Sequence, residues 1–238
     1  MRIADVTIVV PARNEAENIG PFLDSIPWSI PVIVVDESDD ATPRIVTARR
    51  PHDTRVIRGH GGIAACRQLG AELASTPWVL FTDADVEFHA DYFERIAAGA
   101  PADVIYGVKL STGEYARYYR AFAWAQRLSH AVGIPAASGS NMLVRRETLL
   151  ACGGFDEQLS CNEDSELVWR IRADGGSVRL DPRLIVWARD HRRLRRGVFR
   201  KTAHSVLRCA FLRSGLLPEP LRRHDWGYWS DARSVRSE

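Results

Sequence analysis

The chain has 238 residues and carries 32 Lys and Arg against 30 Asp and Glu, a net charge of +2 that gives no general affinity for nucleic acid. Hydrophobic residues make up 45% and charged residues 26%, as is typical of a globular protein with a sizeable core. The apolar runs are too short to cross a bilayer, no signal peptide is recognisable, and the four cysteines form no Cys-x-x-Cys pair, so we expect a cytoplasmic protein with reduced thiols.

The first hundred residues alternate short apolar strands with helices. Strands are expected at residues 6–10, 31–35, 55–57, 78–81 and 104–106, and helices at 15–26, 44–50, 63–74 and 91–98. Strands that are apolar throughout, with helices between them, predict a mostly parallel sheet covered on both faces. Ligands bind such sheets beyond the carboxyl ends of the strands, so polar residues that directly follow strands are the first candidates for a site.

The second half is less regular, and it shows no internal repeat or linker. Helices are expected at 114–131, 147–151 and 163–173, and short strands at 142–144, 178–180 and 184–187. Residues 189–213 are basic and carry an apolar stripe, which predicts a helical tail. We therefore expect a single α/β domain over residues 1–238.

Asp83 and Asp85 follow the strand at 78–81. Two carboxylates at a strand end can hold Mg²⁺ or Mn²⁺, which take few oxygens from the protein and complete their coordination with phosphate and water. Such a cation stabilises a diphosphate leaving group. Asp-x-Asp is nevertheless a common sequence, and a helix cap or a solvated turn accounts for it as well.

Glu163 and Asp164 begin the helix expected at 163–173. Acidic side chains are favourable at a helix N-terminus, and this effect alone could explain them. The functional alternative is that Asp164 acts as a general base, which takes the proton from an attacking sugar hydroxyl. Glu163 would then orient the hydroxyls of the acceptor.

Other candidates follow strands or glycine turns. Glu37 can accept a hydrogen bond from a uracil imide or a ribose hydroxyl, or it can stabilise its turn. Arg67 can neutralise a diphosphate or form a salt bridge on its helix, and His191 is either a third metal ligand, a diphosphate contact or a solvated side chain. No P-loop and no Gly-x-Gly-x-x-Gly follows the first strand, which counts against an ATPase or a dehydrogenase.

Several segments, in this order, resemble the family 2 glycosyltransferases of the GT-A fold. They are VTIVVPARNEAENI (6–19), VIVVDESDDAT (32–42), LFTDAD (80–85), GSNMLVRR (139–146), GGFDE (153–157) and EDSEL (163–167). The resemblance covers roughly residues 5–191. It implies a Rossmann-like central sheet with a less regular acceptor side, and an inverting transfer from a UDP- or GDP-linked sugar to a glycan, lipid-linked or small-molecule acceptor.

Carried over position by position, the resemblance also implies roles for single residues. Asp85, with His191, would bind Mn²⁺ or Mg²⁺, and Asp164 would be the catalytic base. Glu37 stands where the family has an aspartate, so the base that it would read is left open. The donor residues would be Pro11, Arg13, Glu15, Glu37, Arg67 and Asp83, and the acceptor or sugar residues Gly139, Ser140, Asn141 and Glu163.

The same resemblance divides the domain into a donor half at about 1–107, an acceptor and catalytic half at about 108–191, and a basic helical tail at about 192–238. Two other functions are kept as alternatives. A sugar nucleotidyltransferase also uses strand-end carboxylates, although residues 11–15 lack its glycine-rich basic loop. The tail could instead make the chain a nucleotide-binding module or a peripheral protein at the inner membrane surface, whereas a helix packed on the domain is the simpler explanation.

Overall fold

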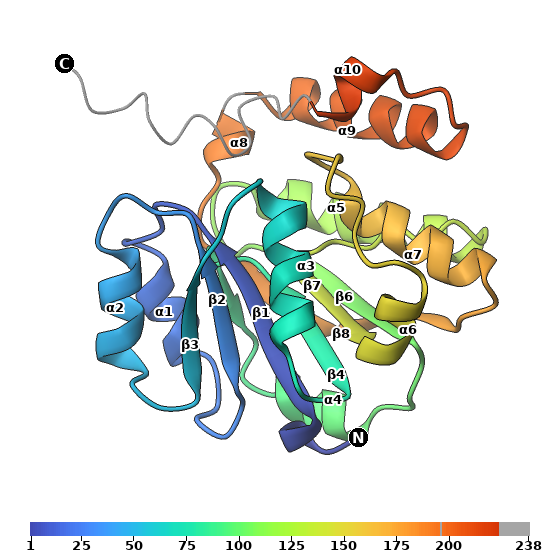
Figure 1. Ribbon diagram of the computed structural model, residues 1–238. Coiled ribbons are helices and arrows are strands. Elements are labelled where there is room, and N and C mark those ends of the chain that lie inside the picture. The colour runs from blue at the N-terminus through green and yellow to red at the C-terminus, as the bar shows by residue number, and fades with distance from the viewer. Residues whose placement is uncertain (196, 224–238) are drawn as a thin grey trace.

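The computed structural model describes residues 1–195 and 197–223 (Figure 1). Residues 224–238 of the predicted tail, with Trp226, Tyr228 and Trp229, lie outside the described residues. The described strands join one sheet in the order β3-β2-β1-β4-β7-β6-β8-β5. The strands are β1 (Val6–Ala12), β2 (Val32–Asp36), β3 (Thr54–Arg58), β4 (Trp78–Thr82), β5 (Val86–Phe88), β6 (Val104–Leu110), β7 (Asn141–Arg145) and β8 (Val178–Ala188).

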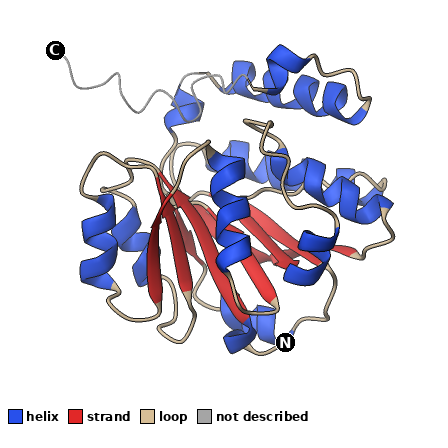
Figure 2. Cartoon of the chain, viewed as in Figure 1, coloured by secondary structure: helices blue, strands red, loops and turns tan. Residues whose placement is uncertain are grey.

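Helices flank this sheet on both faces (Figure 2). After a short 3₁₀ turn at Ile3–Asp5 they are α1 (Ile19–Asp24), α2 (Thr42–Arg49), α3 (Ile63–Leu73), α4 (Tyr92–Ala98), α5 (Ala116–Ala131), α6 (Arg146–Ala151), α7 (Glu163–Ala173), α8 (Arg192–Arg195), α9 (Val198–Arg213) and α10 (Glu219–Arg222). None of the helices in the described residues has the length and apolarity that crossing a bilayer requires.

The sheet is mostly parallel, as the sequence predicts. β1 runs parallel to both β2 and β4, β2 runs parallel to β3, and β6 runs parallel to β8. β7 lies antiparallel between β4 and β6, and β5 is an antiparallel edge strand on β8. β1, β2 and β4 are buried along their whole length, because helices cover both faces of a parallel sheet.

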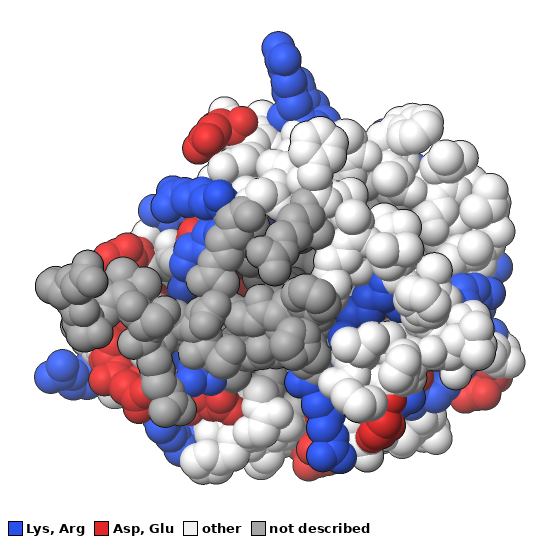
Figure 3. All heavy atoms as spheres, turned by 90° about the horizontal axis from the view of Figure 1, so that it is seen from above, with Lys and Arg blue, Asp and Glu red and all other residues white. Residues whose placement is uncertain are grey.

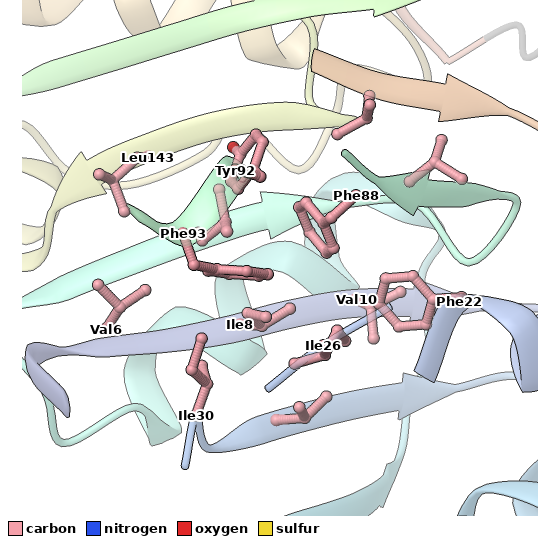
Figure 4. Packing of buried hydrophobic residues seen from close by; sticks show 14 of the residues in the cluster. Val6, Ile8, Val10, Phe22, Ile26, Ile30, Phe88, Tyr92, Phe93 and Leu143 are labelled. Carbon is pink, nitrogen blue, oxygen red and sulfur yellow. The ribbon is translucent and has the colours of Figure 1, made fainter. Parts of the chain in front are cut away.

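Two hydrophobic clusters lie on opposite faces of the sheet. Successive side chains of a strand point to opposite faces, so Ile8 and Val10 enter one cluster while Val9 enters the other. The first cluster packs β1 and β2 against α1 and α4, and it includes the rings of Phe88 and Tyr92, whose centroids are 4.7 Å apart (Figure 4). The second cluster packs the other face against α3, α6 and α7.

The structure differs from the sequence prediction at several boundaries. The strands expected at 178–180 and 184–187 are one strand, because both segments pair with β6, on either side of a register shift between Tyr106 and Val108. The strand β5 was not predicted. The helix expected at 15–26 is confined to α1, and the expected helical tail is broken into α8 and α9 at Gly197, whose φ is 120°.

Candidate active site

Three neighbouring strands bring the donor residues of the sequence analysis to one edge of the sheet. β1, β2 and β4 are parallel neighbours, so their carboxyl ends lie side by side. Pro11 is the next-to-last residue of β1 and pairs with Val35 of β2. Arg13, Glu37 and Asp83 follow the ends of these strands, and they therefore face the same loops.

Glu37 is held between the loop after β1 and the start of α3. Its Oε1 accepts hydrogen bonds from the Gly62 N–H at 3.1 Å and from the Cys66 thiol at 3.4 Å. Its Oε2 lies 3.8 Å from a terminal nitrogen of Arg13. Gly62 has a φ of 91°, a conformation that favours glycine, and this turns its N–H toward the carboxylate. The contacts fix Glu37 in one orientation at the donor edge.

The two aspartates after β4 share one cation in this structure. The Lys109 ammonium, at the end of β6, lies 3.3 Å from Asp85 Oδ1 and 3.9 Å from Asp83 Oδ2. All three side chains are half-buried. Asp83 and Asp85 therefore converge on a position that is favourable for positive charge. Sequence reasoning missed Lys109 as a site residue, since its strand was expected to end at Tyr106.

Glu15, in the loop after β1, also lies near Asp85. It forms an ion pair with Arg192 of α8, and its Oε2 accepts a hydrogen bond of 2.7 Å from the Asn18 amide. Burial raises the pKa of Glu15 to about 7, and repulsion from Asp85 adds to the shift. The Asp85 carboxylate is therefore close enough to disfavour the charged form of Glu15.

A buried arginine joins the end of β4 to helix α7. The Arg67 guanidinium donates to Asp83 Oδ1 at 2.9 Å and, through its other terminal nitrogen, to Glu163 Oε1. The side chains of Arg67 and Glu163 are only 3% and 5% exposed. Burial raises the pKa of Glu163, and the adjacent guanidinium opposes that shift. Both terminal nitrogens of Arg67 are thus engaged with carboxylates, and its predicted contact with a diphosphate stays a prediction.

Asp164 lies at the start of α7, and two backbone N–H groups hold its carboxylate. Its Oδ2 accepts from Gly139 at 2.7 Å, and its Oδ1 accepts from its neighbour Ser165 at 2.6 Å. A Cβ at Gly139 would lie 2.2 Å from a terminal nitrogen of Arg67. Glycine is therefore needed there for the 136–141 loop to approach both Arg67 and Asp164.

Ser140 and Asn141, at the end of the 136–141 loop, form hydrogen bonds inside the protein. The Asn141 amide donates to the carbonyls of Val108 and Leu184, and its Oδ1 accepts from the Tyr92 hydroxyl at 2.6 Å. The carbonyl of Ser140 accepts from Thr82 at 3.1 Å. The structure thus places the Asn141 side chain among the strands and not with the carboxylates, and a role for this loop in sugar binding stays a prediction.

His191 lies just beyond β8, next to the backbone of Asp85. The Asp85 carbonyl accepts a hydrogen bond from the Arg189 N–H at 2.9 Å, which brings this segment to the end of β4. The two ring nitrogens of His191 are 3.4 Å from the hydroxyls of Tyr119 and Ser111. Burial lowers the pKa of His191 and favours the neutral imidazole, the form that binds metals. Tyr119, a residue of α5 that contacts His191, was not among the site residues predicted from the sequence.

Comparison with known proteins identifies the family of the chain. The sequence model of glycosyl transferase family 2 matches residues 7–150, more than half of the chain. This chain belongs to glycosyl transferase family 2. The resemblance noted in the sequence is thereby confirmed. The model of glycosyl transferase family 21 also matches, over residues 110–224, which include α7, α8 and α9.

Two curated relatives share much of this family 2 chain. The pre-mycofactocin glycosyltransferase of Mycobacterium tuberculosis is 32% identical over 228 residues, covering 83% of this chain and 45% of that protein. The succinoglycan biosynthesis protein ExoA of Rhizobium meliloti is 31% identical over 194 residues, covering 71% of this chain and 58% of that protein. The chain spans about half the length of these relatives.

Solved structures of glycosyltransferases share the fold. The mannosyltransferase PcManGT of Pyrobaculum calidifontis, in complex with GDP-Man and Mn²⁺, has a TM-score of 0.64 and 25% identity, covering 78% of this chain and 56% of that one. Staphylococcus aureus TarS 1–349 with UDP-GlcNAc has a TM-score of 0.61 at 19% identity, covering 80% of this chain and 59% of that one, and indicates the fold alone. The GT-A fold expected from the sequence is confirmed.

Proposed function

We propose that this family 2 glycosyltransferase moves a sugar from a nucleoside-diphosphate sugar to a hydroxyl group of an acceptor, with inversion at the anomeric carbon. The observation that carries the proposal is that Arg67 links the strand-end aspartate Asp83 to Glu163, the neighbour of Asp164. This link between the aspartate motif and the neighbour of the candidate base supports a single site for donor and acceptor. The GDP-Man bound to PcManGT supports a nucleotide-sugar donor.

Asp85 and Asp83 would hold the divalent cation. The residues fit such an ion, because their two carboxylates already converge on the ammonium of Lys109 and hard oxygen ligands suit Mg²⁺ and Mn²⁺. Within residues 1–195 and 197–223, no three His, Cys, Asp or Glu side chains gather as a metal site, so further ligands would come from the diphosphate and water, or from a moved His191. When bound, the cation would neutralise charge on the departing diphosphate.

Asp164 would take the proton of the acceptor hydroxyl. Two backbone N–H groups orient its carboxylate, and a general base needs such fixed geometry. As the acceptor oxygen forms its bond to the anomeric carbon, the bond from that carbon to the diphosphate oxygen breaks on the opposite side. The hydroxyl proton passes to Asp164, and the nucleoside diphosphate leaves with the bonding electron pair.

Replacing Asp164 with asparagine tests this assignment, because the amide keeps the shape and loses the basicity. We expect transfer to fall by a factor of about 10²–10⁴ while donor affinity, measured by calorimetry, stays within about threefold. Asp174, exposed at the other end of α7, provides the matched control Asp174→Asn. Transfer at the wild-type rate by Asp164→Asn would show that another group is the base.

The products distinguish this function from a sugar nucleotidyltransferase. A glycosyltransferase releases a nucleoside diphosphate and no pyrophosphate, whereas a nucleotidyltransferase exchanges pyrophosphate with the nucleotide-sugar. Incubating the chain with a panel of UDP- and GDP-sugars, with Mn²⁺ and candidate acceptors, and measuring both products decides between them. Pyrophosphate-dependent formation of a nucleoside triphosphate would refute the glycosyltransferase proposal.

A further inference from the structure

Helix α9 turns its apolar side chains outward. Arg208 on its inner face is buried and donates to the carbonyls of Cys161 and Arg222. The outer face carries exposed apolar residues, among them Phe199 at 91% and Val206 at 62% exposure. A surface helix of a globular protein normally directs its apolar stripe toward the core. The reversed orientation of α9 leaves that stripe without a protein layer over it in the described residues.

Helix α5 lies beside α9 and also exposes apolar side chains. Tyr118 of α5 is hydrogen-bonded to Thr202 of α9, so the two helices adjoin. α5 exposes Trp124 at 65%, together with Leu128 and Val132. We call the exposed apolar residues of these two helices the α5–α9 surface. It consists of Trp124, Leu128, Val132, Phe199, Val206, Leu207 and Phe211.

The two helices of the α5–α9 surface carry basic side chains and no acidic ones. Neither residues 115–146 nor residues 191–218 contain an aspartate or a glutamate. Exposed arginines stand on or beside both helices, namely Arg117, Arg120, Arg127, Arg195 and Arg213. Figure 3 looks onto this end of the molecule, and its right-hand half is a broad area of mostly uncharged residues, with basic side chains in and around it and a few acidic ones at its lower edge.

We propose that the α5–α9 surface docks on an anionic lipid membrane. An apolar stripe can enter the boundary between headgroups and acyl chains, while neighbouring arginines bind the lipid phosphates. Nucleic acid would satisfy the arginines and leave the apolar row in water. A second copy of the chain would cover the apolar row and bring two carboxylate-free, arginine-rich faces together.

Docking in this way would set the membrane beside the helix that carries the candidate base. The Asn162 amide donates to the Cys209 sulfur at 3.0 Å, and Arg213 lies over the Trp169 ring at 5.4 Å. These contacts attach α9 to α7 and to the residue that precedes it. Figure 1 shows α9 above the end of the sheet at which β1 and β2 terminate.

The test is sedimentation of the full chain with vesicles, and it needs no transfer activity. One set of vesicles is phosphatidylcholine mixed with phosphatidylglycerol, and the other is phosphatidylcholine alone. We expect binding to the mixed vesicles to be at least about tenfold tighter, because several arginines each interact with anionic lipid. Val206→Glu with Leu207→Glu should weaken it at least about a hundredfold, since two apolar side chains are lost from the membrane-facing row.

Trp28 provides the matched control, because it is 62% exposed and precedes β2 at the opposite end of the sheet. Trp28→Glu should bind like the wild type, and Phe199→Ser serves as a second, milder α9 variant. Calorimetric binding of the nucleotide-sugar confirms that each variant is folded. Wild-type protein that stays in solution with both vesicles, equal binding to both, unchanged binding by the α9 variants, or a dimer that these variants dissociate would each overturn the proposal.

Discussion

Replacing Arg67 with methionine should remove a large share of the stability of the fold. The substitution leaves Asp83 and Glu163 without the guanidinium that now bridges them, and Glu163 is almost wholly out of contact with water. Removing one partner of a buried ion pair costs about 3–5 kcal/mol, because the other charge is left uncompensated. The total free energy of unfolding of a domain is about 5–15 kcal/mol, so the loss is readily measured.

Urea unfolding of the full chain, followed by tryptophan fluorescence, gives this free energy if the slope m is unchanged. The matched control is Arg49→Met. Arg49 pairs with Asp24 on the surface, with side chains 47% and 62% exposed, and such pairs contribute about 0–1 kcal/mol. The double variant Arg67→Met, Glu163→Gln should recover part of the loss, because no buried charge then remains opposite the methionine.

The pH dependence adds a second measurement on the same variant. Without Arg67, the largest influence that opposes the effect of burial on the Glu163 pKa is lost, so the folded protein holds this proton to higher pH than the unfolded chain does. Arg67→Met should therefore gain stability, relative to the wild type, as the pH falls below neutral. If Arg67→Met costs no more than Arg49→Met at neutral pH, the buried bridge does not stabilise the protein and this reasoning is wrong.

Three further substitutions test other contacts. Gly70→Ala should destabilise the fold by about 1–3 kcal/mol in urea unfolding, because a Cβ there would lie 2.3 Å from Val9 Cγ1. The raised pKa of Glu15 should lower the stability of the wild type as the pH rises from 4.5 to about 7, since the folded state then binds more protons than the unfolded chain, and Glu15→Gln should reduce that slope in pH-dependent unfolding. Asp85→Ala should abolish the effect of Mn²⁺ on nucleotide-sugar affinity measured by calorimetry.

The parallel part of the fold is predictable because its signals are local. β1, β2 and β4 are short apolar runs buried on both faces, and polar residues or proline mark their ends. β5 is different, since its three residues are a strand only through pairing with β8. The insertion of β7 between β4 and β6 likewise depends on contacts between distant segments, and no local pattern specifies it.

The candidate site divides in the same way. Glu37 and Asp83 were found because parallel strands end at one edge, so residues after different strands meet without any knowledge of packing. Lys109 carries no such signal, because a single lysine beyond an expected strand end is indistinguishable from a solvated one. The burial of Arg67 depends on Glu163, 96 residues away in the sequence, and such a partner cannot be read from a helix in isolation.

Helix α3 connects the separate parts of the site. The N–H of Gly62, at its start, binds Glu37 after β2, and one turn later Arg67 binds Asp83 after β4 and Glu163 of α7. Gln68, the next residue, accepts a hydrogen bond from the Phe155 N–H at 3.0 Å. A displacement of α3 would therefore disturb the predicted nucleoside contact, the aspartate motif and the helix of the candidate base together.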